Sequence, residues 1–459
     1  MTEKVYAHFI GVGGAGMSGL ALVLHERGAT VTGSDLKRSR YLNALEQAGM
    51  PVMIGHDAVN LGDPEVVVVS SAIPERNPEL AEARARGIDV WPRAKMLAHL
   101  AGGRRTVAVA GSHGKTSTSS MIATIFRGMG LDPTFLIGGE IAGERTNAAN
   151  GNGEYYIVEA DESDGSFVYL SPHVAVITNI EIDHVDHYKS LADLEGAFAE
   201  FISRTVEGGK VVCCADDERL VQLASSTGVP LVTYGASLAS DVRFFDAMPH
   251  EGGSRFSVAF PGGEEVTCTV QVPGQHMVSN ATAALACAWT FGVDVTRAAA
   301  ALSTFAGVRR RFDLVAEVAG VSIVDDYAHH PTEVAATLDA ARSLGFSRIW
   351  VLFQPHRYSR TEAFAPQFGA ALGKADRPVL MDVYAAGEIP IPGINGKTVL
   401  DAVFDVRPRA QGAYLPHRAD VVPYLAGSVR SGDLVITMGA GDVSAIGPEL
   451  AKALGQEER

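Results

Sequence analysis

The chain has 459 residues, of which 47% are hydrophobic and 20% charged, so it is long enough for roughly two to four domains with buried cores. Its 53 acidic and 38 basic residues give a formal net charge of −15, which argues against a nucleic-acid or membrane-surface protein. No apolar stretch reaches the roughly 20 residues of a membrane span, and the start of the chain lacks a signal-peptide layout. With four cysteines and no CxxC pair, the sequence predicts a cytoplasmic protein with reduced thiols.

The first glycine-rich loop follows the apolar run YAHFI and reads GVGGAGMSG over residues 11–19. Gly11, Gly13 and Gly16 fit the GxGxxG spacing, and Asp35 ends the next strand-like run about 20 residues on. Taken alone, this pattern favours an NAD-dependent dehydrogenase. Such a loop, however, binds the pyrophosphate of its ligand and not the nicotinamide, so a sugar–nucleotide diphosphate fits the same geometry.

A second loop, GSHGKT over residues 111–116, follows the strand-like run TVAVA and precedes a helix-like segment. Backbone N–H groups of such a loop point at phosphate oxygens, Lys115 adds a positive charge, and Thr116 offers a hydroxyl to Mg²⁺. Val109 stands at the first glycine position of the full GxxxxGK[ST] pattern. The order of strand, loop and helix favours a P-loop over a glycine-rich turn with an exposed lysine. A dehydrogenase needs no P-loop.

Acidic and histidine side chains follow the next strand-like runs. Glu159 comes after YYIV, and His184 and His187 come after VAVITNI. Ligands bind at the carboxyl ends of parallel strands, and Mg²⁺ prefers carboxylates with phosphate oxygens and water. We therefore expect a magnesium site with Glu159 as a ligand. The two histidines with neighbouring acids indicate a second metal site or a phosphate site, with a direct role for His184. A solvated acidic turn is the alternative, and zinc is disfavoured by the lack of paired cysteines.

Later polar clusters complete the set of candidates. His276 and Asn280 lie one helical turn apart and could face an adenine or begin a core helix. Arg357 and Arg360 follow the strand-like run RIWVLF, and planar arginine forks bind carboxylates or phosphates. Two further stretches, GVRRRFD with Arg311 and DDYAHHPTE with Asp326 and His329, lie near the start of a third α/β segment.

Seven motifs in order over nearly the whole chain resemble the Mur ligase family of bacterial peptidoglycan synthesis: GVGGAGMSG, GSHGKT, EADESDGSF, TNIEIDHVDHY, GQHMVSNA, DDYAHHPTE and FQPHRYSRT. The alternation of short β-rich runs with helix-like segments predicts an α/β protein with mostly parallel sheets. The resemblance implies three such domains. They are a Rossmann-like UDP-binding domain over 1–104, a P-loop ATPase-like central domain over 105–315, and a Rossmann-like C-terminal domain over 316–459 that binds the amino acid and closes over ATP.

By the same resemblance, each group of site residues has an expected role. Substrate binding is expected of Gly13, Gly14, Gly16, Met17, Ser18, Asp35, His56, Ser70, Ser71 and His329. ATP binding is expected of Gly111, Ser112, His113, Gly114, Lys115, Thr116, Ser117, His276, Asn280, Arg311 and Asp326. Catalysis is expected of Lys115, His184, Arg357 and Arg360, and metal binding of Thr116, Glu159 and His184.

The resemblance implies a cytoplasmic enzyme that uses ATP and Mg²⁺ to join L-alanine to the carboxylate of UDP-N-acetylmuramate through an acyl phosphate. Such an enzyme serves cell-wall biogenesis, and with it cell shape, the cell cycle and division. It would be a monomer or homodimer with no nucleic-acid or membrane partner. The alternatives are a ligase that recycles a preformed peptide onto the same UDP sugar, a folate-polyglutamate ligase, an NAD-dependent dehydrogenase, and a non-enzymatic ATP-binding switch.

Overall fold

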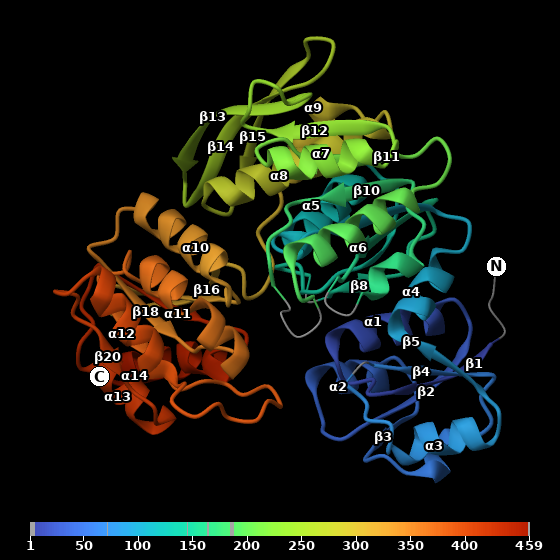
Figure 1. Cartoon of the computed structure of the whole chain (residues 1–459), viewed down its shortest axis with the longest axis horizontal. Helices are drawn as coiled ribbons and strands as arrows, with labels where there is room; N and C mark the ends of the chain where they lie inside the picture. Colours follow the sequence, from blue (N-terminus) through green and yellow to red (C-terminus); the bar gives the residue numbers. More distant parts are fainter. Residues whose placement is uncertain (1–4, 71, 145, 163–164, 184–187, 458–459) are drawn as a thin grey trace. The chain divides into compact units, whose positions relative to one another are not determined.

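The computed structural model describes residues 5–70, 72–144, 146–162, 165–183 and 188–457. They form three sheets of mostly parallel strands with helices packed on them, which confirms the predicted α/β class (Figure 1). Within this part of the chain, no helix is long and apolar enough to cross a membrane. The chain divides into two compact units, the first Met1–Phe244, Val258–Val266 and Ser279–Thr304 and the second Phe245–Ser257, Thr267–Val278 and Phe305–Arg459.

The first sheet lies in the first unit and has the parallel strand order β3-β2-β1-β4-β5. The chain order reverses between β1 and β4, and parallel α/β sheets bind ligands in the crevice at such a switch point. The loop of residues 11–14 leaves β1 at this point. The elements are β1 Tyr6–Ile10, α1 Ala15–Glu26, β2 Thr30–Asp35, α2 Arg40–Gln47, β3 Val52–Ile54, η1 Ala58–Leu61, β4 Val66–Val69, α3 Pro78–Ala85, β5 Asp89–Pro92 and α4 Arg93–Ala101.

The second sheet has the strand order β15-β14-β13-β12-β11-β10-β6-β9-β7-β8. Strand β6 lies between β10 and β9 and is parallel to both, so polar residues after all three strands meet at one edge. The elements are β6 Arg105–Ala110, α5 Lys115–Gly128, β7 Thr134–Leu136, β8 Ala148–Ala149, β9 Tyr155–Glu159, η2 Ser166–Tyr169, β10 Val174–Ile177, α6 Leu191–Ser203, β11 Lys210–Cys214, α7 Glu218–Ser226, β12 Leu231–Gly235, β13 Val242–His250, β14 Gly253–Ala259, β15 Glu265–Val270, α8 Gln275–Thr290 and α9 Val295–Leu302.

The third sheet lies in the second unit and has the order β16-β17-β21-β18-β19-β20. Only β16 runs antiparallel to its neighbour among the described pairs. The elements are β16 Asp313–Val318, β17 Val321–Asp326, α10 Pro331–Ser343, β18 Arg348–Phe353, α11 Tyr358–Leu372, β19 Arg377–Leu380, α12 Gly396–Val406, β20 Ala413–Tyr414, α13 Arg418–Ala426, β21 Asp433–Met438, η3 Asp442–Ala445 and α14 Ile446–Glu457. The predicted domain boundaries at residues 105 and 316 remain predictions.

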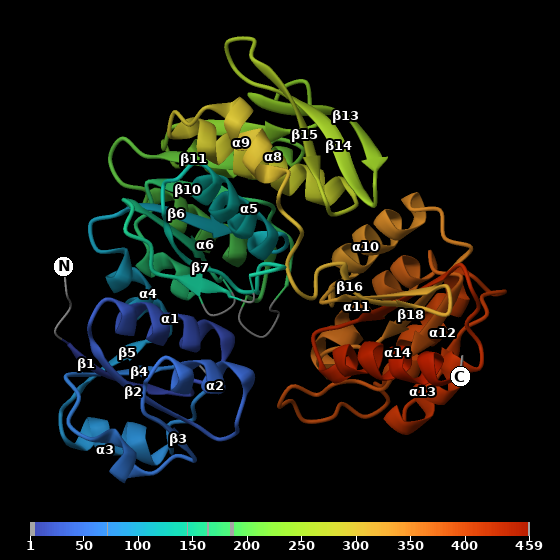
Figure 2. The same ribbon diagram turned by 180° about the vertical axis from the view of Figure 1, so that it is seen from behind.

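Strand β18 shows why the third sheet is buried on both faces. Successive side chains of a strand point to opposite faces. Ile349, Val351 and Phe353 accordingly pack with α10, α11 and α12, whereas Trp350 and Leu352 pack with α13 and α14. Figure 1 shows α11 and α12 on the near face of this sheet, and the reverse view in Figure 2 brings α13 and α14 forward. Such burial explains the continuous apolar run IWVLF.

Candidate functional site

The first glycine loop joins β1 to α1. Gly11 has a φ of +81°, and Gly14 is the N-cap of α1. The Gly13 N–H donates to Oδ2 of Asp35 at 2.9 Å, and a side chain at Gly13 would meet that carboxylate at 2.8 Å. The Asp35 carboxylate therefore holds the loop through its backbone, and glycine is required at residue 13 for this close approach.

A cavity of about 310 Å³ opens beside this loop. It brings together four of the residues predicted to bind the substrate and Glu159, which was predicted to bind a metal. The ends of strands β1, β4 and β5 of the first sheet and of β7 and β9 of the second sheet supply its walls. The site therefore combines a glycine loop with one cation and two carboxylates. The lining residues are Gly11, Gly14, Gly16, Met17, Gly19, Ser70, Arg93, Leu97, Leu136, Ile137, Gly138, Asn147, Glu159 and Asp161.

Arg93 is a cavity residue that the sequence analysis missed. It is the first residue of α4, its Nη1 would lie 3.3 Å from a Cβ at Gly16, and its Nη2 is 3.5 Å from Oδ2 of Asp161. A guanidinium beside a glycine loop suits an anionic ligand. The signal was available, because Arg93 directly follows β5 at the sheet's carboxyl edge.

Two other predicted substrate residues, Ser18 and His56, lie outside the described cavity lining. The Ser18 hydroxyl donates to the Ala15 carbonyl within α1 at 3.0 Å, so it belongs to the helix and not to the described cavity lining. His56 follows β3, and its Nδ1 is 2.9 Å from the Ser34 hydroxyl. Ser71 lies outside the described residues.

The second glycine loop joins β6 to α5, as predicted. Gly111 and Gly114 have φ values of +133° and +83°, which favour glycine. A side chain at Gly114 would meet Oδ1 of Asn280 at 2.6 Å, so α8 packs Asn280 against this loop. Thr116 and Ser117, in the first turn of α5, are both buried.

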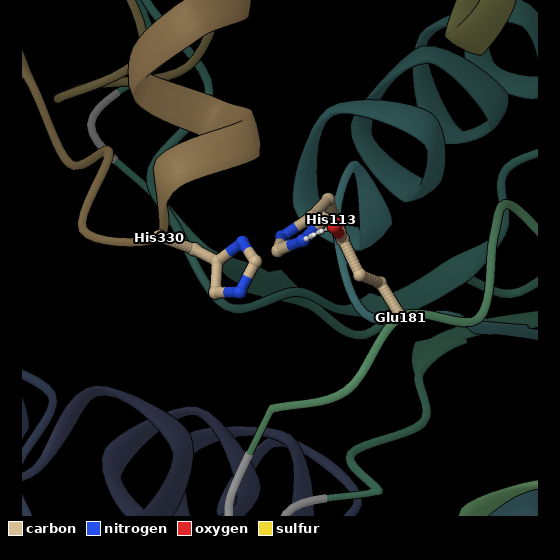
Figure 3. A group of neighbouring side chains, drawn as sticks. All are labelled: His113, Glu181 and His330. Carbon is tan, nitrogen blue, oxygen red and sulfur yellow. Dashed lines mark hydrogen bonds and ion pairs between the residues drawn. The ribbon is translucent and has the colours of Figure 1, made fainter. Parts of the chain in front are cut away.

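Residues after β10 brace the second loop. The Ser112 hydroxyl donates to the Glu181 carbonyl at 2.8 Å, and the His113 N–H donates to the Asn179 side chain at 2.9 Å. Nε2 of His113 is 2.9 Å from Oε2 of Glu181, and Figure 3 shows these two side chains facing each other. His330, which is also drawn in Figure 3, caps α10 in the second unit.

Lys115 has an unusually acidic environment for a nearly buried side chain. Its Nζ donates to the Gly111 carbonyl at 2.6 Å and to Oε1 of Glu162 at 2.8 Å, and 13% of the side chain is exposed. Burial alone would lower the pKa of Lys115, but the carboxylates of Glu162, Asp161 and Glu159 raise it above its usual value. The ammonium group is therefore charged at neutral pH, directly behind the loop.

The two predicted metal ligands that the structure describes, Thr116 and Glu159, supply oxygen donors, which suit Mg²⁺. Oε2 of Glu159 accepts the Gly138 N–H at 2.8 Å, and a Cβ at Gly138 would lie within 2.8 Å of both Glu159 oxygens. Glycine at residue 138 thus leaves room for this carboxylate at the end of β9. The Thr116 hydroxyl is the second described donor. His184, predicted as a ligand and a catalytic residue, lies outside the described residues, as does His187.

In the second unit, the carboxyl edge of the third sheet holds Arg311, Asp326, His329, Arg357 and Arg360, whereas His276 lies in α8. Asp326 ends β17, is buried, and accepts the N–H groups of Phe312 and Ala328 at 2.8 and 2.7 Å. Burial raises its pKa to about 6 despite the nearby Arg311 guanidinium. Nη1 of Arg311 is 3.5 Å from Oε1 of Glu333, and Nδ1 of His329 is 2.9 Å from the Tyr327 carbonyl.

Arg357 and Arg360 lie at the start of α11, beside His356. Arg357 has a φ of +70°, and its N–H donates to the Tyr384 carbonyl at 2.9 Å. This backbone conformation is strained for a residue other than glycine, and such strain is concentrated at functional sites. Arg360 is 6% exposed, and its Nη1 is 3.5 Å from Nδ1 of His356.

His276, in the first turn of α8, gives a pH-dependent prediction. Burial and the Arg311 guanidinium lower its pKa from 6.5 to about 4. Between these pH values the folded protein binds fewer protons than the unfolded chain. The contribution of His276 to the free energy of unfolding is therefore fully present above pH 6.5 and is lost as the pH falls towards 4. We expect a loss of about 2–3 kcal/mol from this group between pH 7.5 and 4.5. Urea unfolding at both pH values should show a smaller loss for His276→Gln than for the wild type.

His250→Gln is the matched control, because the His250 side chain is 41% exposed. Its stability loss between the two pH values should equal that of the wild type. An identical loss in His276→Gln would contradict the prediction.

The fold and the two glycine loops define a class of protein. Successive α/β sheets carry two glycine loops at strand ends, and the second has the lysine and threonine of a P-loop. This arrangement belongs to multidomain α/β proteins that handle phosphate-bearing ligands.

Comparison with known proteins narrows the class. Residues 6–105 match the Mur ligase family catalytic domain, residues 109–288 the Mur ligase middle domain, and residues 310–441 the Mur ligase glutamate ligase domain. The chain is 46% identical over 452 residues to the UDP-N-acetylmuramate–L-alanine ligase of Acidothermus cellulolyticus, with 97% of this chain and 94% of that protein covered. The chain belongs to the Mur ligase family.

Two solved structures resemble the fold over nearly the full length. The crystal structure of UDP-N-acetylmuramate–alanine ligase from Thermotoga maritima has a TM-score of 0.82 at 28% identity and covers 99% of this chain and 100% of that one. A murein peptide ligase from Psychrobacter arcticus has a TM-score of 0.73 at 27% identity and covers 98% and 99%. These similarities confirm the predicted three-domain architecture.

Proposed function

We propose that the protein is an ATP-dependent amide-forming ligase that joins L-alanine to the carboxylate of UDP-N-acetylmuramate and releases ADP and phosphate. The observation that carries the proposal is the shared cavity, in which the first glycine loop and Glu159 line one space. A sugar nucleotide held at the glycine loop would have its reacting end near the P-loop sheet. The 46% identity to a ligase of this name supports the same reaction.

A free carboxylate is a poor acyl donor, because its leaving group would be oxide. Attack of a carboxylate oxygen on the γ-phosphorus of ATP expels ADP and forms an acyl phosphate, whose leaving group is phosphate. Charge spreads over the phosphoryl oxygens during this transfer. Backbone N–H groups of residues 111–116 and the charged Lys115 are suited to bind and neutralise those oxygens. The amine of L-alanine then attacks the acyl carbon, and phosphate leaves.

The proposal includes Mg²⁺, with the Thr116 hydroxyl and the Glu159 carboxylate as oxygen donors and His184 as a further ligand. When bound, the ion would screen the negative charge of the phosphates and polarise the transferred group. Glu159 is held in place by the Gly138 N–H. Thr116 is fixed by the first turn of α5.

We assign the amino acid to the third sheet. The guanidinium groups of Arg357 and Arg360 suit the carboxylate of L-alanine, because planar arginine forks bind carboxylates through paired hydrogen bonds. Asp326, which accepts two backbone N–H groups, would set the position of the segment that carries His329. The enzyme is expected to work in the cytoplasm as a monomer or homodimer.

Phosphate release from ATP and Mg²⁺ tests this function. It should require both UDP-N-acetylmuramate and L-alanine and exceed the rates with glycine or L-serine. The similarity to a murein peptide ligase makes peptide recycling the second candidate. Phosphate release with a tripeptide and not with L-alanine would establish that alternative. If no acceptor supported phosphate release, both functions would be contradicted.

A further inference from the structure

A buried hydrogen-bond network in the first sheet centres on Glu79 of α3. Oε2 of Glu79 accepts the Ser34 hydroxyl at 2.5 Å and is 3.4 Å from Nε2 of His8. Oε1 accepts from Nδ2 of Asn60 at 2.8 Å and from the Asp57 N–H at 3.2 Å. The Glu79 side chain is completely buried. Burial opposes its charge, but the hydrogen bonds from His8, Ser34 and Asn60 lower its pKa to about 2.

The hydrogen bonds around Ser34 determine which ring nitrogen of His56 carries the proton. An ionised carboxylate only accepts, so the single proton of the Ser34 hydroxyl goes to Glu79. The short 2.5 Å separation is typical of an O–H donor on a carboxylate. The Ser34 oxygen, 2.9 Å from Nδ1 of His56, is then left to accept. Nδ1 of His56 therefore carries a proton, and in the neutral ring Nε2 is an acceptor.

The network of Glu79 is also connected to the wall of the predicted UDP site. Ser34 directly precedes Asp35, whose carboxylate holds the glycine loop at Gly13. The Gly55 N–H donates to the Asp35 carbonyl at 2.8 Å, just before His56, and 9% of the His56 side chain is exposed. Glu79 thus joins α3 to the end of β2 and to the segment after β3.

We propose that Glu79 is a positioning residue that holds His56 as the Nδ1–H tautomer, so that Nε2 accepts a hydrogen bond from an N–H or O–H donor of the substrate's uridine. The inference rests on the proposed function, because it takes a UDP sugar as the substrate. Uracil offers an imide N–H and ribose offers hydroxyls. Cytosine lacks that N–H, so competition by UDP and CDP tells the two donors apart.

Glu79→Gln tests the proposal, because it changes the shape of the side chain little. Its amide nitrogen is a hydrogen-bond donor at a position where the network needs an acceptor. We expect the KM for UDP-N-acetylmuramate to rise about tenfold, the usual order for one hydrogen bond, with kcat and the KM values for ATP and L-alanine unchanged. Glu82→Gln on the same helix, where the side chain is partly exposed, is the matched control and should behave as the wild type.

A double-mutant cycle separates positioning from a merely structural role. In a His56→Ala background, Glu79→Gln should change the KM for UDP-N-acetylmuramate less than twofold, because the group that it positions is gone. The same tenfold rise in both backgrounds, or no rise in either, would overturn the proposal.

The tautomer can be measured without the Glu79 variant. Long-range ¹H–¹⁵N spectra of the ¹⁵N-histidine-labelled wild type, with His56 assigned by its absence in His56→Ala, should show the Nδ1–H tautomer. An Nε2–H tautomer would overturn the inference. This result is independent of turnover, so a wild type that does not use the UDP sugar would count against the proposed function alone.

Discussion

Replacing Lys115 with alanine is expected to abolish ligation while UDP-N-acetylmuramate still binds. Lys115 is the charged group behind the P-loop, held there by Glu162 and the Gly111 carbonyl. Loss of a preorganised cation at a transferring phosphoryl group costs about a thousandfold or more in rate. The first glycine loop and its cavity contain no part of this side chain. Phosphate-release rates and calorimetric titration with the UDP sugar measure the two effects separately.

Lys397→Ala is the matched control, since Lys397 is 58% exposed on α12 and pairs with Asp401 on the same helix. Its turnover should equal that of the wild type. Undiminished ligation by Lys115→Ala would remove the P-loop from the mechanism.

The second large effect is expected from Gly111→Ala. Gly111 has a φ of +133°, and a Cβ there would overlap the Thr178 hydroxyl and lie 3.0 Å from the Asn179 carbonyl oxygen. Both partners follow β10, so the loop and the strand end must separate. We expect a loss of about 2–4 kcal/mol in unfolding free energy and loss of ADP binding. Urea unfolding and nucleotide titration measure these changes.

Gly196→Ala provides a glycine-to-alanine control within α6, where nothing lies within 4 Å of the added methyl group. A helix-interior alanine should raise stability by up to about 1 kcal/mol and leave ADP binding unchanged. Wild-type stability in Gly111→Ala would show that the P-loop is not constrained as described.

The two glycine loops could be predicted because their signals are local. Gly11 to Gly16 and Gly111 to Thr116 each follow an apolar run and precede a helix, and strand ends at one edge of a parallel sheet lie together. The prediction that Glu159 belongs near such loops rests on the same rule. Predicting these residues did not require knowledge of the strand order.

Other parts of the site depend on contacts between distant residues. Glu79 reaches Ser34 across 45 positions, and Arg93 reaches Asp161 across 68. Both depend on strand order and helix placement, which alternating apolar patterns do not specify. From the sequence alone, Glu79 resembles an ordinary solvent-exposed glutamate of a helix. Ser18 lies within the motif and its hydroxyl donates to the Ala15 carbonyl of α1, so its role in substrate binding stays a prediction.

The central claim is that ATP activates the substrate carboxylate by direct phosphoryl transfer. The most direct measurement uses UDP-N-acetylmuramate labelled with ¹⁸O in its carboxylate, together with unlabelled ATP and L-alanine. Mass spectrometry of the released phosphate should find one ¹⁸O per molecule of phosphate, because the attacking oxygen leaves with the phosphorus when the amide forms. Phosphate without label, formed at the same rate as the amide, would contradict the acyl-phosphate mechanism.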